Sequence, residues 1–581
     1  MRVLVALFLG ILFLGCETTT EEKVADFPTH FENSEGTETA TYLQIIDFYI
    51  RLAKEFPEIN FQTIGETDSG QPLHIVTYNP DSDFNFNKIG TEKTIVLINN
   101  GIHPGESDGI DATMMLYRDF ATGKLDPPKN TVLVSIPVYN IGGALNRNSE
   151  TRVNQNGPVS YGFRGNAKNY DLNRDFMKAD SKNALSFMEI FHLTKPDIFV
   201  DNHVSNGADY QYTLTHLFTQ HNKMGGTLGQ YLHKQLMPTL ENALADQSWD
   251  ITPYVNVFNT VPEKGFSQFM DHPRYSTGYT TLWNTLGLMV ETHMLKPYKQ
   301  RVAGTYELMK QLIAIAEKDG DTIKTLREKA FSDYRAQKYY PLQWAIDTTR
   351  SSTINFKGYM ADTLVSEVTG LPRLKYDRKR PFEKPVTYRN HMRPTDSVPI
   401  PKAYIIKKGY ENIIDLLEQN QIEYRQIRND SALVVESYKI KEYKTYTEAY
   451  EGHYPHYGTK VSKETIKVLF SEGDYLVLTD QPGIRYVLES LEPIAMDSFF
   501  NWNFFDTILQ QKEDFSPYVF EEVAAKLLKS DQNLREAFLE KKNNDPEFES
   551  DWYAQLEWVY HRSVHYEKAH LQYPVYRIPK D

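Results

Sequence analysis

The chain has 581 residues, of which 40% are hydrophobic and 24% are charged. This composition excludes a largely disordered chain, and the length exceeds what one hydrophobic core usually serves, so we expect two or three domains. The formal net charge of −14, without a long basic run, argues against a nucleic-acid partner.

The first sixteen residues are expected to be an export signal. Arg2 precedes an apolar run from Val3 to Leu14, which is shorter than the roughly 20 residues that span a bilayer as a helix. The run ends at Cys16, the only cysteine, which therefore can form no internal disulfide. The stretch LFLGC resembles a bacterial lipoprotein signal, although Phe13 stands where that pattern usually has leucine. The resemblance implies lipidation of Cys16, a membrane anchor and a place in the cell envelope, facing the periplasm or the cell surface; a buried free cysteine is the alternative.

The next segments predict a tether, a helix and a strand pair. Residues 17–38 are mostly polar and are expected to tether the folded part to its anchor. Apolar residues recur at helical spacing in TATYLQIIDFYIRLAKEFP, from Thr39 to Pro57. Two strands around an Asp-Ser-Gly turn are predicted in INFQTIGETDSGQPLHIVTYN, from Ile59 to Asn79.

Later segments share one pattern, an apolar strand followed at once by a polar cluster. They are TIVLINN, TVLVSIPVYN, PDIFVDN and LGLMVE, and helical patterns such as GIDATMMLYRDFAT and ALSFMEIFHLT lie between them. This alternation predicts an α/β fold with a mixed, largely parallel sheet flanked by helices. Such sheets bind ligands at the carboxyl ends of their strands, so the polar clusters are expected to converge on one edge.

Candidate metal ligands follow two of these strands. His103 and Glu106 lie in GIHPGE after the first, and His203 lies in DNHVSN after another. A lone His-x-x-Glu is weak evidence, because a strand-to-helix loop explains it equally well. Three groups from one sheet edge, with Glu291 at a further strand end, favour a hydrolytic zinc site with two histidines, one carboxylate and an open position for water.

With these motifs the chain resembles the zinc carboxypeptidases, the metallopeptidase family that includes the pancreatic carboxypeptidases, across roughly residues 40 to 320. The likeness covers IGETDSGQPLHIVTYN, GIHPGE and FRGNAKNYDLNRDF, and it ends with His203 and Glu291 in the family's order. The resemblance implies that one zinc ion per chain is bound by His103, Glu106 and His203. It further implies that Glu291 is the general base, and that Asp171 orients the first zinc histidine; a helix cap is the alternative for Asp171.

The resemblance also implies how a peptide with a free C-terminus would bind. Asn173 and Arg174 would hold the terminal carboxylate, for which a guanidinium offers paired donors. A surface salt bridge is the alternative for Arg174. Arg164 would polarise the scissile carbonyl, a role for which Arg147 and Arg152 stay open as alternatives.

The chain departs from the pancreatic pattern at several positions. Gly105 stands where those enzymes have an arginine, so a secondary substrate contact is expected to be absent. The family's mobile substrate-side tyrosine has two candidate counterparts, Tyr275 and Tyr279, and both could instead be core or loop residues. Arg274 could line the pocket for the terminal side chain, although an exposed structural arginine is favoured.

Beyond about residue 330 the resemblance to the peptidase ends. We expect a connector at residues 321–401 and an accessory α/β domain of unknown role at 402–581, after a signal at 1–16, a tether at 17–38 and a catalytic domain at 39–320. The segment from Lys402 to Ile440 predicts strand, helix, strand and strand, and the end of the chain looks mainly helical. His453 and His456 could form a second metal site, but a packed aromatic loop is favoured.

These observations predict an exported, membrane-anchored zinc peptidase that removes C-terminal amino acids from peptides. The rival among enzymes is a zinc amidase acting on cell-wall peptides or on N-acyl amino acids. A rival of another class is a surface lipoprotein that binds peptides without cleaving them. The presence of Glu291 favours an enzyme, because a binding protein has no need of the base.

Overall fold

The computed structural model describes residues 27–580. The predicted signal, Cys16 and the first part of the predicted tether lie outside these residues. Within the described part, no helix combines the length and apolar character needed to cross a membrane.

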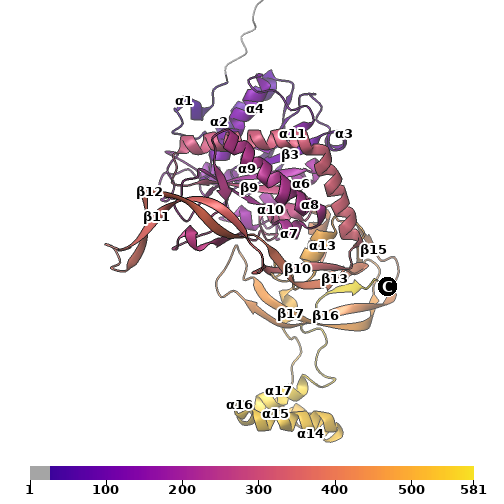
Figure 1. The fold of residues 1–581 in the computed structure, drawn as a ribbon. Helices are drawn as coiled ribbons and strands as arrows, with labels where there is room; N and C mark the ends of the chain where they lie inside the picture. The colour runs from indigo at the N-terminus through magenta and orange to yellow at the C-terminus, as the bar shows by residue number, and fades with distance from the viewer. Residues whose placement is uncertain (1–26, 581) are drawn as a thin grey trace, which may run out of the picture.

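A mixed sheet of eight strands forms the centre of the catalytic part, in the order β1-β2-β4-β3-β5-β9-β6-β7 (Figure 1). Its strands are β1 (Ile59–Glu66), β2 (Pro72–Tyr78), β3 (Thr94–Asn99), β4 (Thr131–Ile136), β5 (Ile198–Ser205), β6 (Leu214–Phe218), β7 (Ile251–Pro253) and β9 (Leu286–His293). Neighbours from β4 to β9 run parallel, whereas β2 and β6 pair antiparallel with β4 and β9. The predicted α/β fold is confirmed.

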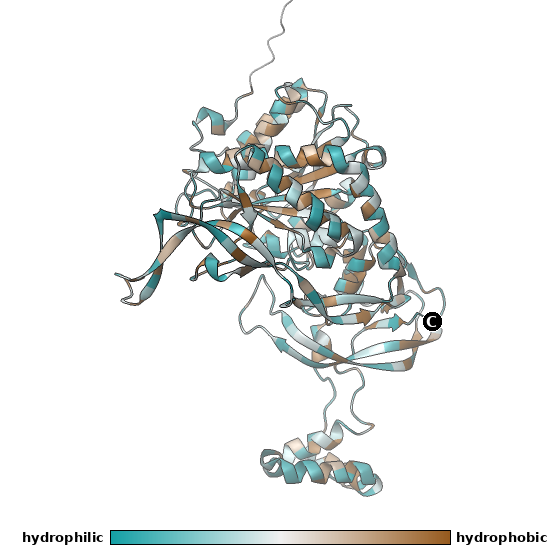
Figure 2. Cartoon of the chain, in the orientation of Figure 1, coloured by the Kyte–Doolittle hydropathy of each residue, from teal (hydrophilic) through white to brown (hydrophobic). Residues whose placement is uncertain are grey.

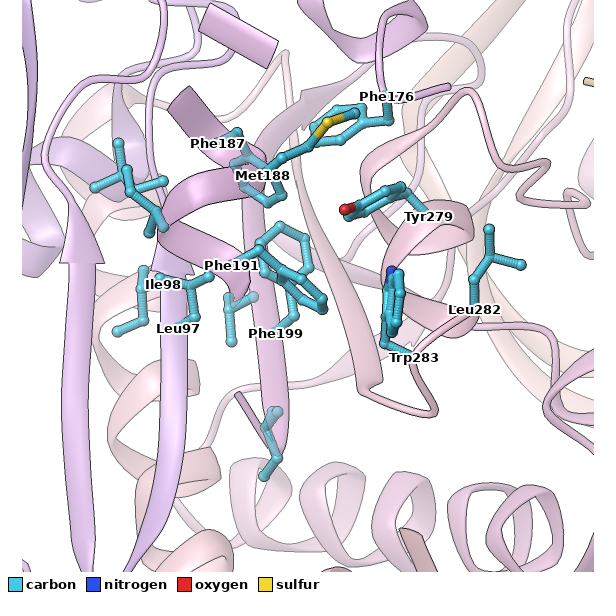
Figure 3. Close-up of a cluster of buried hydrophobic side chains, with 14 of the residues drawn as sticks. Leu97, Ile98, Phe176, Phe187, Met188, Phe191, Phe199, Tyr279, Leu282 and Trp283 are labelled. Atoms are coloured by element: carbon cyan, nitrogen blue, oxygen red, sulfur yellow. The ribbon is translucent and has the colours of Figure 1, made fainter. Parts of the chain in front are cut away.

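Helices cover both faces of this sheet because its central strands are apolar on both sides. Every residue of β3 and β4 is buried, as expected for parallel strands between helical layers. One layer contains α2 (Tyr42–Glu55), α4 (Asp108–Ala121) and the long α11 (Tyr298–Ala336). The other contains α6 (Lys182–Thr194) and α10 (Ser276–Thr281). Aromatic side chains from α6, β5 and α10 fill the second interface, as Figure 3 shows for Phe187, Phe199 and Tyr279.

Shorter helices precede the first strand or connect later ones. They are α1 (His30–Asn33), α3 (Phe86–Glu92), α5 (Ile141–Leu145), η1 (Leu172–Arg174), α7 (His221–Met224), α8 (Gly226–Tyr231), η2 (Leu232–Leu236), α9 (Met237–Asp246) and η3 (Pro262–Lys264). The segment η2 is π-helical and joins α8 to α9. Residues 27–38, placed in the tether by the sequence, are folded against the domain. Phe27 and Phe31 are buried, and Glu32 pairs with Arg118 at 2.5 Å. These two aromatic residues anchor a stretch that is otherwise polar.

The range predicted as a connector carries regular structure. Its start is the C-terminal part of α11, which continues past residue 320 without a break. Strands β10 (Tyr339–Ile346) and β13 (Met392–Pro399) then form a ribbon, while β11 (Ser352–Val365) and β12 (Pro372–Arg389) form a projecting hairpin. The hairpin joins the short strand β8 (Phe266–Ser267) of the catalytic part.

The C-terminal part is built on a six-stranded sheet in the order β15-β18-β14-β19-β16-β17. Its elements are β14 (Ala403–Ile406), α12 (Glu411–Gln419), β15 (Tyr424–Gln426), β16 (Ser431–Thr445), β17 (His456–Phe470), β18 (Tyr475–Leu478), α13 (Ile484–Leu491), η4 (Asp506–Leu509) and β19 (Val575–Ile578). The predicted strand, helix, strand and strand at its start are confirmed. Many of its buried apolar residues belong to the same hydrophobic cluster as the catalytic core, whereas Ile405, Val435 and Phe470 form a small cluster of their own.

The helical end of the chain forms a separate bundle, at the bottom of Figure 1. It contains α14 (Pro517–Ser530), α15 (Gln532–Asn544), α16 (Pro546–Ser550) and α17 (Trp552–Tyr560). A small apolar cluster of its own holds these helices together, and their outer faces are hydrophilic (Figure 2).

Candidate active site

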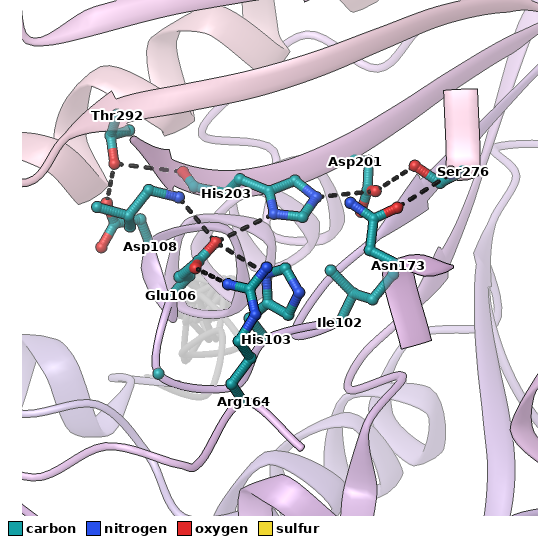
Figure 4. A network of polar contacts seen from close by, with 12 residues as sticks. Ile102, His103, Glu106, Asp108, Arg164, Asn173, Asp201, His203, Ser276 and Thr292 are labelled. Carbon is teal, nitrogen blue, oxygen red and sulfur yellow. Dashed lines mark hydrogen bonds and ion pairs between the residues drawn. The ribbon is translucent and has the colours of Figure 1, made fainter. Parts of the chain in front are cut away.

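Three buried side chains converge beside the carboxyl ends of β3 and β5. His103 lies in the loop after β3, Glu106 lies just before α4, and His203 is on β5. Oε2 of Glu106 lies 3.3 Å from Nδ1 of His103 and 3.0 Å from Nδ1 of His203 (Figure 4). Each residue offers a ligand atom within 4.8 Å of the others. The structure therefore brings together the three residues expected to bind zinc.

Two aspartates hold the outer nitrogens of these imidazoles. Oδ1 of Asp171 lies 2.9 Å from Nε2 of His103, and Oδ2 of Asp201 lies 2.9 Å from Nε2 of His203. Such pairs fix the ring and keep its other nitrogen free to bind a metal. Asp171 was predicted from the sequence, whereas Asp201 was not. The signal for Asp201 was present, because residues two apart on a strand share a face, and Asp201 precedes His203 by two on β5.

The arrangement fits a divalent metal ion. Nδ1 of His103 is buried and has no hydrogen-bond partner. Although burial opposes it, Asp201 and Glu106 raise the pKa of His203 well above its ordinary value, so the surroundings favour a positive charge here, which a bound metal would supply in place of the proton. Burial likewise opposes the ionisation of Glu106, but His103 and Arg152 hold its pKa well below the usual range. Two imidazole nitrogens and an ionised carboxylate form a donor set that suits zinc.

Glu291 lies beside the three candidate ligands without belonging to their group. β5 and β9 run parallel with His203 paired to Glu291, so both side chains lie on the same face of the sheet. Loss of solvation raises the pKa of Glu291 to about 7, with Glu106 adding to the rise and His203 opposing it. A carboxylate with a pKa near neutrality is suited to accept and return a proton.

Among the three candidate arginines, Arg164 faces the cavity at this site. Its Nη1 lies 3.6 Å from Oε1 of Glu106, and its Nε donates to Asp171 at 2.9 Å. Arg152 instead donates to Glu106 at 2.8 Å and to Gln155 at 2.7 Å, and it does not line the cavity. Arg147 points away and donates to backbone carbonyls. The geometry favours Arg164 over both alternatives.

The cavity has a volume of about 400 Å³ and contains most of the predicted substrate-binding residues. The side chains that line it include His103, Glu106, Arg164, Asn173, Arg174, His203, Tyr254, Tyr275 and Glu291. The guanidinium of Arg174 lies over the ring of Tyr275, 4.6 Å from its centre. Oδ1 of Asn173 accepts a hydrogen bond from the backbone N–H of Ser276 at 3.1 Å. The side-chain nitrogen of Asn173 takes no part in this bond.

The prediction for Tyr279 is wrong. Tyr279 is fully buried, its hydroxyl donates to Asn420 at 2.6 Å, and its ring packs against Phe187 and Phe191 (Figure 3). It sits on α10 facing the core, where no substrate can reach it. A tyrosine that the sequence analysis missed, Tyr254, lines the cavity just after β7. No sequence signal distinguished it, because a loop has no periodicity to show which side chains point inward.

Gly105 and Arg274 are explained by their surroundings. A Cβ at Gly105 would lie 2.5 Å from Cδ of Arg152 and 2.8 Å from the carbonyl oxygen of Gly162, so this position has no room for an arginine. Arg274 does not line the cavity, and it is mostly buried, not exposed as favoured from the sequence. Its guanidinium pairs with Asp497 of the C-terminal part at 2.7 Å.

The C-terminal part also touches the site. Oε2 of Glu451 accepts a hydrogen bond from the backbone N–H of Asp171 at 2.8 Å. His453 and His456 bind separate carboxylates, those of Asp180 at 2.8 Å and Asp506 at 3.0 Å. Both histidines pack against aromatic rings, as the favoured prediction states. The loop that carries Glu451 therefore supports the aspartate that orients His103.

No protein-family model matches the chain, and the comparison with curated proteins found no match. Similar solved structures include a metallo-carboxypeptidase from Burkholderia cenocepacia, at 18% identity over 47% of this chain and 68% of that one, with a TM-score of 0.36. Carboxypeptidase A from Helicoverpa armigera matches at 14% identity over 48% and 74% of the two chains, with a TM-score of 0.37. A metallo-carboxypeptidase from Pseudomonas aeruginosa matches at 14% over 48% and 69%, with a TM-score of 0.35. These likenesses cover about half of this chain and are too low to assign an activity, so that assignment depends on the side chains themselves.

Proposed function

We propose that the protein is a zinc-dependent metallocarboxypeptidase that removes C-terminal amino acids from peptides. The observation that carries the proposal is the buried group of His103, Glu106 and His203 in a cavity of about 400 Å³ that also holds Glu291 and Arg174. One part of this set suits a hydrolytic metal, and the other offers a cation for a substrate carboxylate.

Zinc held by His103, Glu106 and His203 would polarise the scissile carbonyl and make a water molecule more acidic. Glu291 accepts a proton from the attacking water and later delivers it to the leaving amine. Arg164, on the cavity wall, stabilises the negative charge that forms on the carbonyl oxygen. Asn173 and Arg174 hold the terminal carboxylate of the peptide and so select its last bond.

Arg174→Ala is expected to weaken the binding of peptides with a free C-terminus and to blunt discrimination against their C-terminal amides. Loss of a hydrogen bond to a charged group costs about 1.5–3 kcal/mol, which corresponds to a rise in KM of roughly 10- to 150-fold for the free acid. Steady-state kinetics on a matched acid and amide pair measures this. Arg380→Ala, in an exposed ion pair on β12, is the control. An equal loss on both substrates would show that Arg174 has another role.

Asp201→Asn is expected to lower zinc affinity by about 10- to 100-fold, the usual cost of losing an outer carboxylate partner of a metal-binding histidine. The affinity is followed as peptidase activity lost against increasing chelator concentration. Asp47→Asn, in an exposed pair on α2, should leave that curve unchanged. If Asp201→Asn behaves like this control, Asp201 does not support the metal site.

The rival amidase shares the metal chemistry but not the need for a free peptide C-terminus. Arg174 in the same cavity as the candidate metal ligands favours a substrate with a free carboxylate, which a peptide C-terminus or an N-acyl amino acid supplies and an amidated peptide does not. Murein peptides and N-acyl amino acids, tested beside ordinary peptides, separate the remaining alternatives. A protein that binds all of these without cleaving them would be the peptide-binding lipoprotein.

We propose further that the protein is exported and anchored to a membrane through a lipid on Cys16. The support is the sequence alone, an apolar run that ends at the only cysteine. Cys16→Ser is expected to move the protein from the membrane fraction to the soluble fraction of cells, as followed by immunoblotting. Unchanged partitioning would contradict the lipid anchor.

A further inference from the structure

Three histidines meet outside the candidate active site, where the catalytic part joins the ribbon that follows it. His221 begins α7, His233 lies in the π-helical segment η2, and His391 lies between β12 and β13. Each offers a ring nitrogen within 4.8 Å of the others. The rings of His221 and His233 are parallel with centres 4.1 Å apart, and the ring of His391 stands nearly perpendicular to both.

Histidines removed from water normally satisfy their ring nitrogens with carboxylates or carbonyls. His216, close by on β6, does so, because its Nε2 lies 2.7 Å from Oε1 of Glu241. Of the three clustered histidines, His391 is buried, whereas His221 and His233 are half-buried. The three clustered rings show no such bond among the described residues, and Nδ1 of His391 is buried without a partner in a residue that is only 8% exposed. An unpaired nitrogen in a buried ring is costly unless a ligand completes it.

The backbone around the cluster holds the rings in place. The side chain of Gln220 donates to the carbonyl of Asn390 at 2.7 Å, and Asn222 accepts from the N–H of Met392 at 2.8 Å. These two bonds place His391 directly against His221. The π-helical turn at His233 is a second local departure from regular structure, and such turns are frequent at functional sites.

A small cavity of about 20 Å³ adjoins His221 and His233. Its volume is enough for one water molecule. Burial, with His233 and His391 adding to it, lowers the pKa of His221 to about 3, and burial also lowers the pKa of the other two rings. The rings are therefore neutral at physiological pH, which is the form that binds metals.

We propose that His221, His233 and His391 bind a second zinc ion, with water in the adjoining cavity as the fourth ligand. Three imidazoles and a water form a recognised tetrahedral zinc set. Zinc–nitrogen bonds of about 2.0–2.1 Å would bring the nitrogens to about 3.3 Å from one another. Because the lone pair of an imidazole nitrogen lies in the ring plane, the parallel rings of His221 and His233 would tilt toward each other on binding the ion. The ion joins the turn between β12 and β13 to α7 and η2, and so fastens the β11–β12 hairpin to the catalytic part.

The surrounding charges limit the affinity of this site. Arg350 and Lys234 act against a cation here, whereas Glu241 and Asp347 favour it. The first site has an ionised carboxylate among its own ligands, and this one has none. We therefore expect the three-histidine site to release zinc to a chelator before the His103 site does, and the expected content becomes two zinc ions per chain where the sequence predicted one.

The test is the zinc content of the full chain after removal of all metal, reloading with Zn²⁺ alone and desalting, measured by elemental mass spectrometry. Wild type should hold two ions per chain. His233→Ala and His391→Gln should hold one and keep peptidase activity, and His203→Ala should hold one and lose activity. His216→Ala, which alters the same cavity without removing a ligand, should hold two. One ion in wild type, unchanged in His233→Ala and His391→Gln, would overturn the proposal.

A measurement with the cluster intact covers the case in which these variants fold poorly. In His203→Ala protein, Zn²⁺ should slow hydrogen exchange in residues 219–236 and 388–393. Exchange in these segments that is the same with and without Zn²⁺ would also overturn the proposal. Neither result depends on whether the His103 site hydrolyses peptides, so this inference and the proposed function can fail separately.

Discussion

Glu291→Gln is expected to lower turnover by about 10²–10⁴-fold, the usual contribution of a general base, while the zinc content stays at the wild-type value. Glutamine preserves the shape of the side chain and most of its hydrogen bonding but cannot accept a proton from water. Glu291 is placed for this role by the register of β5 and β9, and its pKa, raised to about 7 by loss of solvation, matches a proton acceptor near neutrality.

Single-turnover cleavage of a peptide, with metal content measured on the same samples, checks this result. Glu383→Gln, an exposed carboxylate on β12, is the control and should leave turnover unchanged. Loss of zinc together with activity would make Glu291 a ligand. Activity within a few-fold of wild type would contradict the assigned mechanism.

Asp497→Asn is expected to destabilise the folded chain by about 3–5 kcal/mol, the usual cost of breaking a buried ion pair from one side. Asp497 is buried and accepts from the side chain of Arg274 at 2.7 Å and from its backbone N–H at 2.8 Å. The guanidinium also lies 5.1 Å from the ring centre of Trp502. Without Asp497, the charge of Arg274 stays in an apolar setting between the two parts of the molecule.

A matched substitution shows whether the cost arises because the Arg274–Asp497 pair is buried, or would follow the loss of any ion pair between the catalytic and C-terminal parts. Arg335 on α11 pairs with Asp480 at 2.6 Å, but both side chains are exposed. Asp480→Asn should therefore cost about 0–1 kcal/mol. Urea unfolding followed by tryptophan fluorescence compares the two variants. Equal shifts of the midpoint would show that burial of the Arg274–Asp497 pair does not matter.

The central sheet and the candidate metal ligands could be predicted because their signals are local. Strands such as TIVLIN are apolar throughout, so parallel packing and a common edge for their polar ends follow from the sequence. Once β5 and β9 are placed in one parallel sheet, His203 and Glu291 are expected on the same edge. The α/β fold and the convergence of His103, Glu106 and His203 could be predicted from this local pattern of apolar strands with polar residues at their ends.

The site residues that were predicted wrongly or missed depend on contacts between segments that are distant in the sequence. Tyr275 and Tyr279 stand four residues apart in one stretch, and only the packing of α10 decides that one faces the cavity and the other the core. Tyr254 reaches the cavity from an irregular loop. The cluster of His221, His233 and His391 needs a turn that lies more than 150 residues along the chain from its partners, which no spacing rule connects.

The C-terminal part shows the same limit on a larger scale. The order of its first elements was predicted from periodicity, but its contact with the catalytic part was not. Asp497 binds Arg274, and Glu451 binds the backbone of Asp171. Both pairs join residues more than 200 positions apart. Many apolar residues of the two parts also belong to one continuous cluster, which crosses the boundary drawn from the sequence at residue 402.

The central claim is that the protein, with zinc bound at the His103 site and Arg174 holding the terminal carboxylate, removes single residues from peptides with a free C-terminus. Mass spectrometry of one peptide, as its free acid and as its C-terminal amide, tests it most directly, with protein loaded with zinc and protein stripped of metal. We predict that the zinc-loaded protein shortens the free acid by one residue at its C-terminus and leaves the amide intact. The protein stripped of metal should cleave neither peptide. Internal cleavage, equal cleavage of acid and amide, or release only from murein peptides would contradict the account.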